Sequence, residues 1–125
     1  MTDKDPLVFV IHIIESIKNI ESFMDKISKN NFFKNKEKQS AVIRQIEVVG
    51  EAAKNLPAEF RIKYKNIPWK DIVGMRDKLM HHYFGINLKI VWKTVKEDIP
   101  NLKDKILEIK KILEAENKNL KKREK

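Results

Sequence analysis

Residues 76–84, with the sequence RDKLMHHYF, contain side chains whose chemistry suits phosphate and RNA. Arg76 carries a permanent positive charge on a planar fork of donors that matches a phosphate group. His81 and His82 titrate near neutral pH and can accept or donate a proton. Tyr83 offers a hydroxyl group and a ring on which a base can stack. These are the parts needed to cleave RNA without a metal ion: a base for the 2′-hydroxyl group, a cation for the crowded phosphate and an acid for the leaving oxygen.

An ideal helix does not place all of these groups on one face. At about 100° per residue, Arg76 and Tyr83 lie within roughly 20° of each other, whereas His81 lies roughly 140° from Arg76 and His82 roughly 120° away on the other side. A site that joins Arg76 to either histidine therefore needs a helix that distorts or ends near Gly85, or a second copy of the chain across a two-fold axis. From spacing alone, a solvated helix end without chemistry remains an alternative.

The sequence contains little that favours a metal site or another class of catalysis. It has no cysteine, which excludes disulfides and thiolate ligands. His81 and His82 are adjacent and lack the i, i+4 spacing and the carboxylate of a two-histidine metal motif, and His12 is far away in the sequence. A glycine-rich phosphate loop is absent, as is a serine beside a candidate base. We therefore expect neither a metal ion nor another cofactor.

Length and charge limit the class of protein further. The chain of 125 residues suits one domain. Its 27 basic and 18 acidic residues give a net charge of +9, which favours anionic partners such as nucleic acid, although solubility alone is the simpler explanation. Residues 117–125, NKNLKKREK, hold five basic residues against Glu124, a net charge of +4. We expect them to form a basic tail after a helical domain of residues 1–116.

Membrane insertion is not expected. The longest apolar run covers residues 7–11, far short of a membrane span. The sequence MTDKDP at the beginning of the chain is polar, carries two acidic residues and does not resemble a signal peptide. A cytoplasmic protein is therefore the default expectation.

Apolar residues recur at helical spacing along almost the whole chain, which predicts an all-α fold. The expected elements are helices over residues 6–29, 37–56, 69–84 and 87–95, a short helix over residues 57–64, and a last helix that begins at Pro100. The stretch SKNNFFKNKEK, residues 28–38, interrupts the pattern and is expected to be a connection. Short connections favour an up-down bundle of about five helices.

Gly50 interrupts the second of these helices. Glycine inside a helix costs roughly 1 kcal/mol relative to alanine. A close approach of another helix would explain that cost, and Ala52 and Ala53 beside it are small as well. The small residues are also a candidate for the interface of a dimer. A tolerated defect is the alternative.

Residues 67–106, IPWKDIVGMRDKLMHHYFGINLKIVWKTVKEDIPNLKDKI, strongly resemble the HepT-like proteins, also called the DUF86 family, within the HEPN superfamily. The signature R-x4-H-x-Y reads here Arg76, His81 and Tyr83, with His82 at the variable position. The stretch AVIRQIEVVGEAAKNLP, residues 41–57, also resembles the second helix of this family. The resemblance covers about residues 6–113.

The resemblance implies an all-α HEPN bundle that forms a homodimer, with the motif in a cleft between subunits. It implies a metal-independent endoribonuclease, the toxin of a toxin–antitoxin pair, that acts on RNA, with tRNA as one candidate. The partner would be an MNT-type minimal nucleotidyltransferase antitoxin, which attaches AMP to the motif tyrosine, here Tyr83. Arg76 and His81 would be the catalytic residues, and Asp77, His82 and Tyr83 would support the site or contact RNA.

One position departs from the family pattern, and it keeps a second reading open. Many relatives have asparagine directly after the motif arginine, whereas this chain has Asp77, which adds negative charge near a substrate phosphate. Glu47 and Glu51 are candidates to orient Arg76, although both suit ordinary surface positions. The alternative function is a non-catalytic subunit that binds a nucleotide or nucleic acid and assists a nucleotidyltransferase.

Overall fold

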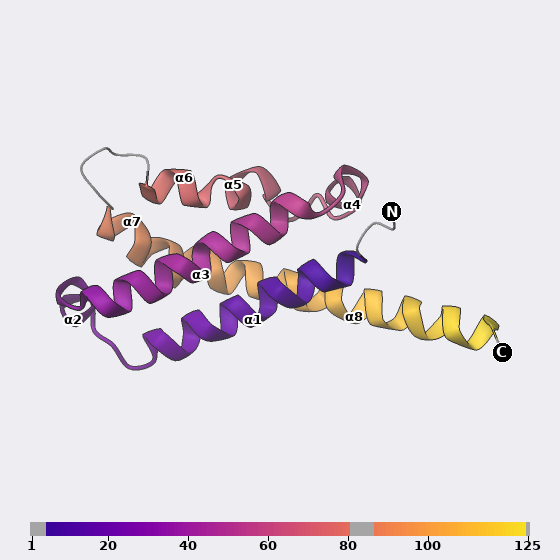
Figure 1. The fold of residues 1–125 in the computed structure, drawn as a ribbon, viewed down its shortest axis with the longest axis horizontal. Helices are drawn as coiled ribbons and strands as arrows, with labels where there is room; N and C mark the ends of the chain where they lie inside the picture. The colour runs from indigo at the N-terminus through magenta and orange to yellow at the C-terminus, as the bar shows by residue number, and fades with distance from the viewer. Residues whose placement is uncertain (1–4, 81–86, 125) are drawn as a thin grey trace.

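A computed structural model describes residues 5–80 and 87–124, with all of their side chains except those of Arg76, Met80 and residues 121–124. Within these ranges the chain forms eight α-helical segments and one π-helical turn and has no strands, which confirms the predicted all-α fold. The helices lie side by side along one long axis (Figure 1). No helix in the described ranges is both long and apolar enough to cross a membrane.

Three long helices form the framework of the bundle. They are α1 (Pro6–Met24), α3 (Lys36–Asn55) and α8 (Ile99–Glu124). Helix α1 packs against both α3 and α8, and α3 also packs against α5 (Trp69–Val73) and α6 (Met75–Met80). The buried core runs between these elements. Helix α3 is therefore central, since it links α1 to the two short helices that carry the beginning of the candidate motif.

Helix α1 begins as its sequence predicts. The Asp5 side chain accepts a hydrogen bond from the backbone N–H of Leu7 at 2.9 Å, and Pro6 occupies the first helical position, where its missing N–H costs nothing. The helix ends at Met24 instead of continuing to residue 29. Two residues later Lys26 has φ 59°, a left-handed conformation that does not continue a right-handed helix.

The expected connection at residues 28–38 contains a further helix, α2 (Lys29–Lys34). Ser28 caps it by accepting a hydrogen bond from the N–H of Asn31 at 3.1 Å. Phe32 is fully buried, and its burial holds this polar segment against the core. The side chain of Gln39 in α3 donates to the carbonyl oxygens of Phe32 and Phe33 at 2.9 and 3.1 Å. These tertiary contacts stabilise a helix that is too short and polar to be recognised by periodicity.

Gly50 lies where a neighbouring backbone approaches closely. A Cβ atom at this position would lie 3.3 Å from the carbonyl oxygen of Ile72 and 3.6 Å from that of Val73. The predicted close approach is thus confirmed, and its partner is α5 of the same chain. Ala52 and Ala53 are also buried within the chain. These small residues therefore serve packing inside the subunit and are not a free face for a second copy.

We predict that Gly50→Val lowers the free energy of unfolding by about 1–3 kcal/mol, because its branched side chain meets the α5 carbonyl oxygens. Gly50→Ala should be nearly neutral, since roughly 1 kcal/mol of helix propensity offsets a contact in which α5 must shift by a few tenths of an ångström. Denaturant-induced unfolding of both variants measures the difference. A valine variant as stable as the native protein would contradict the close approach.

The helix expected over residues 69–84 is divided at Gly74. Helices α5 and α6 meet there, and the Gly74 N–H donates to the carbonyl oxygen of Lys70 at 3.0 Å. Ile72, Met75 and Leu79 are buried, so one apolar stripe continues across the break. Residues 81–86 lie outside the described residues.

Helix α4 (Ala58–Lys63) agrees with the predicted short helix. The prediction that Pro100 begins a separate last helix is wrong. Helix α7 (Leu88–Lys93), the π-helical turn η1 (Thr94–Asp98) and α8 follow one another without a break. Pro100 lacks an N–H group and would clash with the carbonyl four residues earlier in a regular α-helix, and the wider π-helical turn accommodates it.

Helix α8 also continues through most of the segment expected to be a tail. Leu113 is its last buried residue, but the helix runs to Glu124. Figure 1 shows this last part extending beyond the other helices. Its residues are strong helix formers, and basic residues near a helix C-terminus interact favourably with the helix dipole.

Candidate functional site

Helix α6 carries the beginning of the candidate motif. Arg76 and Asp77 lie in its first turn, and the buried side chains of Met75 and Leu79 fix this helix on the core. The side chain of Asp77 is exposed. The side chain of Arg76, together with the whole of His81, His82 and Tyr83, lies outside the described residues. The roles expected of these residues therefore remain predictions.

The ends of the two helices that flank the motif lie at one end of the bundle. Helix α6 ends and α7 begins near α2 (Figure 1). Asn87 caps α7, because its side chain accepts hydrogen bonds from the N–H groups of Lys89 and Ile90 at 3.1 and 3.3 Å. The Trp92 ring lies 5.7 Å from the ring of Phe32, which ties α7 to α2. The segment with His81, His82 and Tyr83 connects α6 to α7, and α7 is the helix that contacts α2.

Glu47 and Glu51 lie on an open groove along α1 and α3. Glu47 is 3.5 Å from Arg44 on its own helix, and Glu51 is exposed. His12 of α1, distant in sequence, lies on the same groove, with its ring 6.4 Å from that of Phe9 in an edge-to-face arrangement. The groove is lined by Phe9, His12, Arg44, Glu47, Val48, Glu51, Ala52 and Asn55. The expected action of the two glutamates on Arg76 remains a prediction.

The α2 end of the bundle holds functional candidates that the sequence reasoning missed. Residues 28–38 were expected only to connect two helices, yet residues 26–38 contain five lysines. This density of lysines was the feature of the sequence from which a charged surface could have been predicted. In the described part of the chain, no three histidine or acidic side chains are grouped so that they could hold a metal ion.

Comparison with known proteins identifies a family whose model spans most of the chain. The family described as "Ribonuclease HepT-like" matches residues 13–109. A "Putative RNase" of Methanocaldococcus jannaschii is 46% identical over 119 residues, covering 95% of this chain and 98% of the relative. A "Probable ribonuclease HepT" of Thermococcus cleftensis is 48% identical over 99 residues, covering 79% of this chain and 90% of the relative.

A further relative is longer than this chain. The "Gamma-glutamylcyclotransferase and putative RNase" of Methanocaldococcus jannaschii is 50% identical over 116 residues, which cover 93% of this chain. The chain spans about half of that protein, 52% of its length. No solved structure matches the chain.

Proposed function

Because this chain belongs to the HepT-like family of the HEPN superfamily, we propose that it is an endoribonuclease that cleaves RNA with Arg76 and His81. The observation that carries the proposal is the family match over residues 13–109, with the complete signature Arg76, His81 and Tyr83 inside it. Relatives matched over nearly their whole length are named as RNases. A subunit that served only as an adaptor would not need both a motif arginine and a motif histidine.

The proposed reaction is transesterification within the RNA chain. The 2′-hydroxyl group loses its proton to a base and attacks the adjacent phosphorus, and the bond to the 5′-oxygen breaks as that oxygen takes up a proton. The products are a 2′,3′-cyclic phosphate and a 5′-hydroxyl group. His81 acts as general base or acid, and Arg76 stabilises the negative charge that develops on the phosphate oxygens. Asp77, His82 and Tyr83 support the site or contact RNA, and no metal ion takes part.

The site is proposed to be composite, with Arg76 from one subunit and His81 from its partner. The angular mismatch of roughly 140° between these positions on an ideal helix motivates this arrangement. Since Gly50, Ala52 and Ala53 are buried within the chain, the interface must use other residues. The open groove along α1 and α3, which holds Phe9, Val48 and Glu51, is the candidate face on α3.

A mixing experiment tests the composite site. Arg76→Ala and His81→Ala should each be inactive alone, but a dimer that contains one chain of each has one intact site out of two. Random pairing makes about half of the dimers mixed, so co-expressed chains should regain about a quarter of native activity. Light scattering establishes the dimer in moderate salt. A strictly monomeric protein at micromolar concentration, or a mixture without activity, would contradict this arrangement.

The biological setting is proposed to be a toxin–antitoxin pair in the cytoplasm. The partner is an MNT-type minimal nucleotidyltransferase that attaches AMP to Tyr83 and thereby silences the ribonuclease. A second candidate function is a non-catalytic subunit that binds RNA or a nucleotide and assists that partner. The exposed carboxylate of Asp77, beside the motif arginine, favours this second candidate because it would offset the positive charge that cleavage needs in the transition state. A cleavage assay with purified protein separates the two.

A further inference from the structure

We propose that the α2 end of the bundle binds single-stranded RNA and holds the strand beside the motif-bearing segment. The surface consists of the turn after α1, helix α2, the beginning of α3 and the exposed side of α7. This inference rests on the proposed function and deepens it, because it names the surface that grips the substrate. Four features carry this inference: an excess of positive charge, a helix N-terminus, two partly buried aromatic rings and the position of the surface.

Four lysines line a shallow hollow where the turn after α1 meets the junction of α2 and α3. This lysine cluster consists of Lys26, Lys34, Lys36 and Lys38, and Asn31 and Asn35 lie between them. Asp25 and Glu37 line the same hollow, so the four lysines and two carboxylates leave it with a net charge of +2. Ion pairs within the described residues involve Arg44, Lys63 and Lys103 and none of the cluster. The cluster therefore offers its charge to an external polyanion.

The N-terminus of the longest helix on this side adds to that charge. Helix α3 has 20 residues, and its cap Asn35 lies in the hollow together with Lys36 and Lys38 from the first turn. The aligned peptide dipoles place partial positive charge at a helix N-terminus. Lysine side chains and a helix N-terminus thus act on the same point, which suits a phosphate group.

Two partly buried aromatic rings lie on the helices at this end of the bundle. Phe33 lies on α2, with Nζ of Lys29 5.8 Å from its ring centre, and Trp92 lies on α7, with Nζ of Lys96 4.8 Å from its ring centre. Buried Phe32 contacts both rings, at 6.3 and 5.7 Å between centres, and so holds them in place. Aromatic rings between cations are the surface on which single-stranded nucleic acid stacks its bases.

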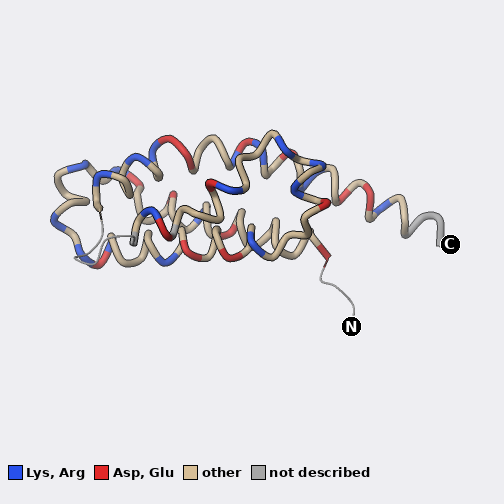
Figure 2. The backbone as a smooth tube through the Cα atoms, turned by 90° about the horizontal axis from the view of Figure 1, so that it is seen from above, with Lys and Arg blue, Asp and Glu red and all other residues tan. Residues whose placement is uncertain are grey.

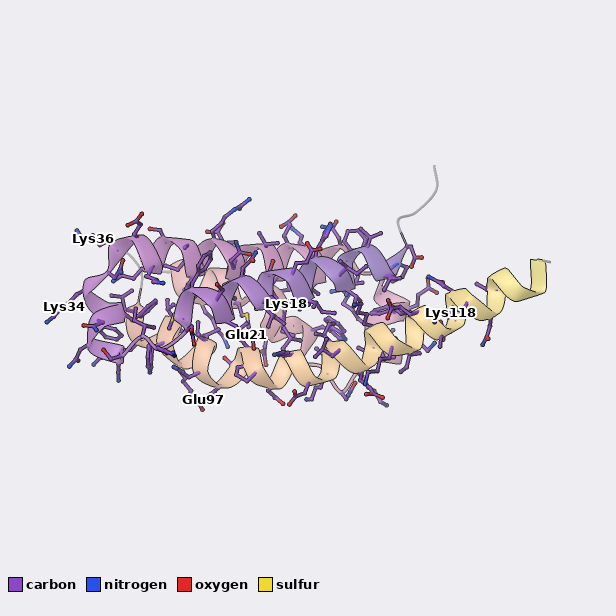
Figure 3. The ribbon with its side chains drawn as sticks, turned by 90° about the horizontal axis from the view of Figure 1, so that it is seen from below. Lys18, Glu21, Lys34, Lys36, Glu97 and Lys118 are labelled. Carbon is purple, nitrogen blue, oxygen red and sulfur yellow. The ribbon has the colours of Figure 1, made fainter. Side chains whose placement is uncertain are left out.

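The position of the cluster distinguishes it from the other basic region of the chain. Lys34 and Lys36 lie at one end of the molecule and Lys118 at the opposite end (Figure 3). Figure 2 shows lysine and arginine positions gathered at the end away from the C-terminus. The end of α6 and the beginning of α7 lie at the same end as α2 (Figure 1). The cluster thus lies at the same end of the bundle as the two helix ends that flank the motif, whereas the end of α8 does not.

Single-stranded RNA fits this surface better than a duplex. In a duplex the bases are stacked on one another and cannot reach Phe33 or Trp92, so only the lysines would contribute. Single strands can use both the phosphate contacts and the rings. The aromatic contribution is therefore the feature that separates the two substrates experimentally.

The test compares two variants with the same change in charge. The first carries Lys26→Gln, Lys34→Gln, Lys36→Gln and Lys38→Gln. The matched control carries Lys54→Gln, Lys65→Gln, Lys111→Gln and Lys118→Gln, four exposed lysines outside the cluster. Thermal unfolding monitors the fold of both. The probe is a fluorescein-labelled oligouridine of about 20 nucleotides with 2′-O-methyl riboses, which cannot be cleaved but keeps the phosphate charge.

Fluorescence anisotropy over a series of salt concentrations provides the readout. The cluster variant should bind at least about tenfold more weakly than the native chain, and the slope of log affinity against log salt should become shallower by about 2–3, since each phosphate contact contributes about 0.7 for a single strand. The affinity of the control variant for the probe should differ from that of the native chain by less than about threefold. Phe33→Leu should weaken single-strand binding about tenfold and leave duplex binding unchanged.

Each outcome decides the proposal. No binding of the probe by the native chain, equal losses in cluster and control variants, or native-like binding by the cluster variant would overturn it. If Phe33→Leu weakens the binding of duplex and single-stranded RNA equally, the proposal that bases stack on Phe33 is wrong. Cleavage of unmodified RNA is measured separately. If the native chain binds RNA through the cluster but does not cleave it, the proposed ribonuclease activity is wrong and the binding surface stands. If the cluster variant cleaves RNA like the native chain, the proposed binding surface is wrong and the activity stands.

Discussion

His81→Ala and Arg76→Ala should each reduce the rate of RNA cleavage by a factor of about 10² or more. In the proposed reaction the histidine moves a proton in the transition state, and such transfer contributes about 10²–10⁴-fold. The proposed role of the arginine is to stabilise charge that appears only as the phosphate becomes crowded, and loss of one such interaction costs about 10²–10³ in rate. Single-turnover cleavage of a labelled RNA measures both effects, with the 2′,3′-cyclic phosphate product identified by mass.

His82→Ala is the matched control for this experiment. It removes the neighbouring imidazole at the variable position of the signature, so its rate should fall far less than that of His81→Ala. Cleavage should also persist in EDTA, because the proposed chemistry uses only side chains. Survival of cleavage in His81→Ala, or its disappearance with EDTA, would show that the roles are assigned wrongly.

Incubation with an MNT-type nucleotidyltransferase partner and ATP should add one AMP group to Tyr83 and stop cleavage. On an ideal helix Tyr83 and Arg76 share a face to within roughly 20°. AMP on Tyr83 would then place its phosphate beside the guanidinium group of Arg76, in the space that an RNA phosphate needs. The adduct would inhibit because its phosphate binds the same guanidinium group that the RNA phosphate needs. Mass mapping of peptides locates the added group.

Tyr64 is the internal control for the modification. It is the other tyrosine of the chain, and its hydroxyl group is buried, so a partner enzyme cannot reach it in the folded protein. Tyr64→Phe should therefore be modified and silenced like the native chain, whereas Tyr83→Phe should resist both. An adduct on Tyr64 or on lysine with Tyr83 untouched would contradict the proposal. So would a Tyr83→Phe protein that is still silenced.

Helical periodicity in the sequence predicted which faces of the long helices are buried. The apolar stripes of α1 and α3 lie in the core, as the helical spacing of their apolar residues predicted. These features depend on residues within a few turns of one another, which is why they can be recognised locally. Gly50 also predicted a tertiary contact, because a glycine inside a helix is destabilising unless another backbone approaches it closely.

The chemistry of the candidate motif was also apparent from residue types alone. An arginine, a histidine and a tyrosine at the spacing of Arg76, His81 and Tyr83 suggest proton transfer and phosphate binding wherever they are placed. Spacing along an ideal helix could not join them into one site, because that depends on a helix end or on a second subunit. The site residues therefore remain a prediction, while the family match supports the class of protein.

Other features required contacts between distant parts of the chain. Helix α2 exists because Phe32 is buried and Gln39 binds its last carbonyls, and the chain stays helical through Pro100 because a π-helical turn precedes it. Only the packing of α2 against α7 brings the lysine cluster to the end where α6 stops and α7 starts. The sequence determined the helices, their buried faces and the reactive side chains, since these follow from local pattern. The tertiary structure decided which helix ends meet, since this depends on long-range burial of side chains such as Phe32 and Trp92 that no local pattern encodes.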